Sequence, residues 1–90
     1  DDLKNFALFL KEIPGYQIII YGYTDSIGSE EANKKLSQNR ANSVKEALSR
    51  YGIKNTRMTS IGKGEADPIA DNTNKAGRAQ NRRIEVELLQ

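Results

Sequence analysis

The apolar run that most constrains the fold of this sequence is Ile18-Ile19-Ile20-Tyr21. It is much shorter than the roughly 18 residues that a membrane-spanning helix needs. Its β-branched and aromatic residues are typical of a buried strand, and with the neighbouring tyrosines they predict a central strand over residues 16–23. The whole chain has 90 residues, which is enough for one hydrophobic core and too few for two. We therefore expect a single domain over residues 1–90.

Helical patterns lie on both sides of this strand. Apolar residues recur at helical spacing over residues 2–12, and the breaker pair Pro14-Gly15 ends that pattern. Ser29 is a suitable N-cap for a second helix that runs to about Tyr51. Gly52 follows where a left-handed C-terminal cap is expected. The sequence thus predicts one helix before the central strand and a longer one after it.

The C-terminal half predicts two more strands, over residues 57–62 and 82–89. In the last strand Ile84, Val86 and Leu88 alternate with charged residues, which predicts one inward face. Residues 62–81 form a long connection, and loops of this length are usually functional or partly helical. The order helix, strand, helix, strand, loop, strand favours an α+β two-layer sandwich with helices on one face of a small mixed β-sheet.

The composition lowers the expectation of catalysis. The sequence contains no cysteine and no histidine, so it lacks thiolate nucleophiles, disulfides and the usual general base near neutral pH. An enzyme would have to use carboxylates, lysine or tyrosine, and we expect no metal and no cofactor. The 14 basic and 12 acidic residues give a net charge of +2, which is too balanced for a nucleic-acid surface.

The second predicted helix carries one residue that looks misplaced. At about 100° per residue, Arg40 falls on the same face as Val44 and Leu48, which are ordinary core residues. The same face continues towards the helix start with Asn33, Leu36 and Ser37. We therefore expect Arg40 to point toward the sheet, where a guanidinium is costly unless polar groups meet it.

Asp25 is the candidate partner of Arg40, and Arg82 is a third charged residue that converges on the same place. Asp25 lies just past the carboxyl end of the central strand, close to where the second helix starts. Arg82 is in register with the inward face at the start of the last strand. Asp25 and Arg40 could form a structural salt bridge, or each could meet the opposite charge of a ligand with an ammonium and a carboxylate on one carbon. The residues alone leave both interpretations open.

The chain also resembles a known family over nearly its whole length. The matching residues, in order, are Gly22-Tyr23-Thr24-Asp25, Asn33, Leu36-Ser37, Arg40-Ala41, Val44, Leu48, Arg57, Gly62, Gly64-Glu65, Pro68, Asn72, Gly77-Arg78 and Asn81-Arg82-Arg83-Ile84-Glu85. They are similar to the signature of OmpA-like peptidoglycan-binding domains, and the subgroup resembles outer-membrane lipoproteins and porin tails.

The resemblance implies non-covalent binding of the meso-diaminopimelate residue of the peptidoglycan stem peptide. Asp25 then takes the ammonium of its D-centre and Arg40 takes the carboxylate. The family's further contacts fall on Thr24, Asn33, Leu36 and Arg82. The resemblance also implies a wall anchor in the periplasm, attached to the outer membrane only through a segment absent from this sequence.

Family domains open with a strand that precedes the first helix, and this sequence starts at that helix. Either the sequence is cut short at its start or another element fills the place. An open sheet edge can pair with another chain, so an edge-strand homodimer is one expected outcome. Two other functions compete with wall binding. One is a protein–protein interaction module in which Asp25 and Arg40 pair structurally, and the other is a wall hydrolase that uses carboxylates.

Overall fold

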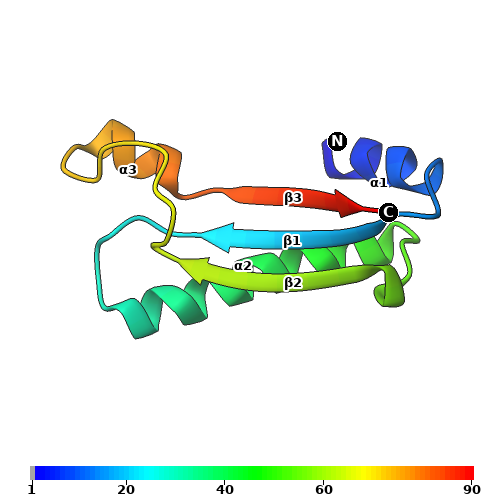
Figure 1. Cartoon of the computed structure of the whole chain (residues 1–90), viewed down its shortest axis with the longest axis horizontal. Helices are drawn as coiled ribbons and strands as arrows, with labels where there is room; N and C mark the ends of the chain where they lie inside the picture. Colours follow the sequence, from blue (N-terminus) through cyan, green and yellow to red (C-terminus); the bar gives the residue numbers. More distant parts are fainter. Residues whose placement is uncertain (1) are drawn as a thin grey trace.

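The computed structural model describes residues 2–90 and contains a three-stranded mixed sheet (Figure 1). Its elements are α1 (Asp2–Lys11), β1 (Gln17–Tyr23), α2 (Glu30–Arg50), the 3-10 helix η1 (Asn55–Arg57), β2 (Met58–Gly64), α3 (Lys75–Asn81) and β3 (Ile84–Leu89). The strand order is β2-β1-β3, with β1 parallel to β2 and antiparallel to β3. The predicted fold class is confirmed, and the long connection proves partly helical because it contains α3. None of the helices within residues 2–90 has the length and apolar character needed to cross a membrane.

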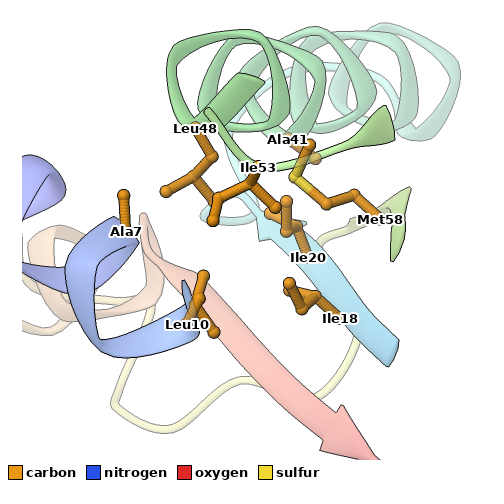
Figure 2. Close-up of a cluster of buried hydrophobic side chains, with 8 residues drawn as sticks. All are labelled: Ala7, Leu10, Ile18, Ile20, Ala41, Leu48, Ile53 and Met58. Carbon is orange, nitrogen blue, oxygen red and sulfur yellow. The ribbon is translucent and has the colours of Figure 1, made fainter. Parts of the chain in front are cut away.

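The core lies between β1 and the two longer helices (Figure 2). Ile18 and Ile20 of β1 are fully buried, as are Leu10 of α1 and Leu48 of α2. Burying one such aliphatic side chain contributes about 1.5–3 kcal/mol. These contacts hold both helices on one face of the sheet and so fix where α2 begins relative to the end of β1.

Two glycines allow α2 to lie very close to the sheet. A Cβ atom on Gly22 of β1 would overlap the Ser37 carbonyl, and one on Gly62 of β2 would lie 2.5 Å from the Gln38 nitrogen. Ser37 of α2 lies next to both glycines, and Ser37 and Ala41 are fully buried. The close approach therefore selects the small residues of α2 as its contact face.

This contact face differs from the predicted one. It is centred on Ser37 and Ala41, so the neighbouring positions Leu36 and Arg40 lie at its margin. Leu36 is 42% exposed and Arg40 is exposed as well. Arg40 is therefore not covered by the sheet as expected, because a long side chain does not fit where backbone meets backbone, but it does line a pocket with residues at the start of β3.

The edge strand β3 is less covered than its pattern predicts. Ile84, Val86 and Leu88 pair with Gly22, Ile20 and Ile18, so they do share the core-facing side. Only Leu88 packs against the core, whereas Ile84 and Val86 are each 37% exposed. Within residues 2–90 the outer edge of β3 has no neighbouring strand. An edge-strand homodimer stays a prediction.

Candidate functional site

The carboxyl end of β1, the first turns of α2 and the start of β3 meet at one end of the molecule, with α3 beside them (Figure 1). The helix α1 lies at the opposite end. Thr24 and Asp25 directly follow β1, and Gly22 pairs with Ile84 in the antiparallel register. In such a pair, residues after Gly22 lie opposite residues before Ile84, and this brings Arg82 to Asp25.

Asp25 is the centre of this site and already has two partners. Its Oδ2 accepts a hydrogen bond from Arg82 Nη1 at 2.7 Å, and its Oδ1 accepts one from the Ile27 backbone nitrogen at 2.9 Å. The Asp25 side chain is 12% exposed and the Arg82 side chain is 42% exposed. The hydrogen bond from Arg82, followed by the one from Ile27, lowers the pKa of the Asp25 carboxyl below its ordinary value. Asp25 is therefore an anion at neutral pH.

Thr24 and Asn33 hold the loop that carries Asp25. Thr24 Oγ1 donates a hydrogen bond to the Asp25 carbonyl at 2.9 Å. Asn33 Nδ2 reaches the carbonyls of Asp25 and Ile27 at 3.3 and 3.0 Å, and Glu65 Oε2 at 3.3 Å. Both residues are at least 95% buried, with exposed fractions of 4% and 5%. In this structure they position Asp25 rather than present polar groups to solvent.

Arg40 stands apart from Asp25. It is exposed and makes no hydrogen bond or ion pair with any of residues 2–90. The predicted structural alternative, an Asp25–Arg40 salt bridge, is therefore wrong, because the carboxylate pairs with Arg82 instead. Arg40 lines an open pocket of about 350 Å³ together with Arg82, Arg83 and Ile84. Leu36 is exposed but does not line this pocket.

Arg83 forms a fixed wall of the same pocket. Its Nε donates to Glu85 Oε2 at 2.6 Å and its Nη2 donates to the Asp67 carbonyl at 2.8 Å. Its guanidinium also lies over the Tyr23 ring, 3.8 Å from the ring centroid. Because Arg83 is satisfied by these neighbours, it adds shape to the pocket and no free charge.

Two features of the site escaped the sequence reasoning. One is the Asp25–Arg82 pair, which the antiparallel register of β1 and β3 could have predicted. The other is the exposed apolar surface of Ile84, which the alternation placed in the core. Within residues 2–90, no group of three or more potential metal ligands among Asp, Glu, His and Cys comes together. The arrangement offers one anion, two guanidinium groups and an apolar surface, which suits a ligand bearing both charges.

Comparison with known proteins places this geometry in context. The model of the OmpA family matches residues 1–82. Outer membrane porin F of Pseudomonas fluorescens is 46% identical over 87 residues, which are 97% of this chain and 27% of that protein. The peptidoglycan-binding protein ArfA of Mycobacterium bovis is 42% identical over 84 residues, covering 93% of this chain and 26% of that protein. The chain thus spans about a quarter of the length of these two relatives.

A solved structure has the same fold. The peptidoglycan-associated lipoprotein of Burkholderia pseudomallei superposes with a TM-score of 0.91 at 37% sequence identity. The match covers 96% of this chain and 73% of that one. The agreement extends over α1, the sheet and α3, so the site described above lies within the shared fold.

Proposed function

Since the chain belongs to the OmpA family, we propose that it binds bacterial peptidoglycan non-covalently and does not cut it. The names of two similar proteins support this proposal, because one is a peptidoglycan-binding protein and the other a peptidoglycan-associated lipoprotein. The similarity to porin F and to that lipoprotein supports a place in the periplasm, with the domain attached to the outer membrane through the rest of a longer protein.

The ligand we propose is the meso-diaminopimelate residue of the stem peptide, held at its free D-centre. Its ammonium binds Asp25, which is ionised and has a side chain that is 12% exposed. Its carboxylate binds Arg40. The observation that carries the proposal is that Arg40 is exposed and unpaired within residues 2–90, yet lines the pocket that Arg82 connects to Asp25.

The strength of binding follows from the contacts. Each charge-assisted hydrogen bond contributes about 1.5–3 kcal/mol when well made. Ile84 adds apolar surface in the same pocket, against which the methylene chain of diaminopimelate can pack. Two charged contacts with this apolar support correspond at best to a binding free energy of about −8 kcal/mol, which is a dissociation constant in the micromolar range.

A pull-down with purified sacculi tests the proposal. We expect Arg40→Gln and Asp25→Asn to abolish retention by the wall, because each removes one of the two charges that the ligand needs. Arg40→Gln is the sharper variant, since Arg40 has no partner among residues 2–90 and its loss should leave the melting temperature unchanged. Arg50→Gln is the matched control. It removes the same charge from the exposed end of α2, about 15 Å further along the helix axis.

The same experiment separates the two rival functions. Muropeptides released from the sacculi would identify a hydrolase and contradict the proposal; Glu65 would be the first acid to test, because Asn33 connects it to the Asp25 loop. Absence of wall binding in the wild-type chain would favour the protein–protein module. Loss of retention in Arg50→Gln as well would show that the wall only attracts positive charge.

Wall chemistry supplies a second test. Sacculi with diaminopimelate should retain the domain, whereas walls with lysine at that position should retain it at least tenfold less. Lysine lacks the carboxylate on the side chain, so Arg40 would lose its partner. Equal retention by both walls, measured by depletion of the unbound protein, would contradict the role of Arg40.

A further inference from the structure

The charges of the site do not balance a simple zwitterion. The described residues place one carboxylate, Asp25, among two guanidinium groups that face the pocket, Arg40 and Arg82. Arg83 forms an ion pair with Glu85, so its positive charge is already balanced. A ligand group with one ammonium and one carboxylate would pair with Asp25 and Arg40 and leave Arg82 without an anion.

Asp25 also has little room for an additional cation while Arg82 is in place. One of its oxygens accepts from Ile27 and the other from Arg82, and its side chain is only 12% exposed. Each oxygen can accept a second hydrogen bond, but because so little of the side chain is exposed, the most direct approach for an ammonium is to take the place of Arg82 at Oδ2. Arg82 can turn away at little cost, because its side chain is 42% exposed and already lines the pocket beside Arg40.

Building on the proposed function, we infer that Arg82 exchanges partners on binding and then holds a second carboxylate of the ligand. The site consequently selects a ligand with one ammonium and two nearby carboxylates. In a stem peptide, this is a chain that ends at the diamino acid, with the carboxylate of its L-centre free. Chains in which that carboxylate is blocked by an amide bond keep only one free carboxylate on the diamino acid and bind more weakly.

The geometry of the pocket agrees with a ligand that is charged at both ends. Ile84 lies among the same lining residues as Arg40 and Arg82 and is 37% exposed. Diaminopimelate carries its two carboxylates at the ends of a short methylene chain. Arg40 and Arg82 can each take one end while the methylenes pack on Ile84.

Two synthetic peptides test this inference by isothermal titration. Both are L-Ala-γ-D-Glu-meso-diaminopimelate; one has the L-centre carboxylate free and the other carries it as the primary amide. Both peptides carry the same glutamate carboxylate, so it does not contribute to the difference between their affinities. We expect the wild-type chain to bind the free acid about tenfold more tightly than the amide, as one solvent-accessible charge-assisted contact predicts.

Variants show which residue binds the second carboxylate of the ligand. In Arg82→Gln the tenfold preference should disappear through weaker binding of the acid, while the amide binds as well as before or better because Asp25 has lost its internal partner. Arg50→Gln should keep the preference, since it removes one positive charge far from the pocket. A preference that survives in Arg82→Gln would overturn the inference.

The peptide comparison in the wild-type chain stands even if Arg82→Gln fails to fold. Equal affinity for the acid and the amide would overturn the second-carboxylate contact and leave the proposed function intact. Failure of the wild-type chain to bind either peptide would overturn both.

Discussion

At the residue scale, the site depends on two charged side chains that meet different surroundings. Asp25 is nearly buried and held by Arg82 and Ile27, whereas Arg40 is exposed and unpaired within residues 2–90. A paired, partly buried charge contributes to stability, but an exposed and unpaired one contributes almost nothing. The loss of Asp25 should therefore affect both stability and binding, and the loss of Arg40 should affect binding alone.

The pairing of Asp25 predicts a pH dependence of stability. The folded-state pKa of Asp25 lies below its unfolded value, mainly because of the hydrogen bond from Arg82. Its contribution is complete above the unfolded pKa and is lost as the pH falls through the folded one. Asp25→Asn should lower the free energy of unfolding by about 1 kcal/mol at neutral pH, a value reduced by the exposure of Arg82. Urea unfolding in steps down to about pH 2 should show this difference vanish; a constant difference would contradict it.

At the element scale, α3 and the loop before it are organised by one buried amide. Asn81, the last residue of α3, is fully buried. Its Oδ1 accepts from the nitrogens of Ile69 and Ala70, and its Nδ2 donates to the Ala70 carbonyl and to Asn72 Oδ1. A helix of 7 residues is too short to be stable alone, so these bonds hold it in place. Because Arg82 follows directly, the amide also helps to position Arg82.

Removing the Asn81 amide should destabilise α3 and the loop before it. Asn81→Ala removes a fully buried amide and leaves the part-buried backbone groups of Ile69 and Ala70 without this partner, and we expect a loss of about 1–3 kcal/mol in the free energy of unfolding. Wall retention should fall as well, because Arg82 loses its support. Gln80→Ala, one residue earlier on the exposed side of α3, is the control and should change neither quantity. Equal effects of the two variants in urea unfolding and sacculus pull-down would contradict the role of Asn81.

At the scale of the whole molecule, the distance between α2 and the sheet fixes the site. Gly22 and Gly62 let the helix backbone approach the strands, and Arg40 projects from the margin of that contact. The same approach sets where α2 begins relative to the loop that carries Asp25. The two charges that we propose for ligand binding come from separate elements, so any change in this packing moves one charge relative to the other.

A pair of glycine substitutions tests this packing. Gly22→Ala puts a Cβ into the Ser37 carbonyl and should destabilise the fold by about 3 kcal/mol, with loss of wall binding. Gly15→Ala is the matched control, because nothing lies within 4 Å of its Cβ and its φ is not positive. It should leave stability unchanged or raise it by about 0.5 kcal/mol. Thermal and urea unfolding that ranked the two variants equally would contradict the close approach.

Local patterns were sufficient to predict the elements. The central strand, both long helices, the Ser29 cap and the left-handed Gly52 are confirmed, because each depends on residues adjacent in the sequence. The resemblance to the OmpA family also followed from the sequence, since the order and spacing of its motifs are properties of the chain itself.

The tertiary structure alone decided which charges pair and which remain free. The register of β1 and β3 brings Arg82, rather than Arg40, to Asp25. The contact at Gly22 rotates the buried face of α2 toward Ser37 and Ala41, which leaves Arg40 in solvent. Helical periodicity could not predict this rotation, because it depends on how closely two backbones approach across the core and not on the helix itself.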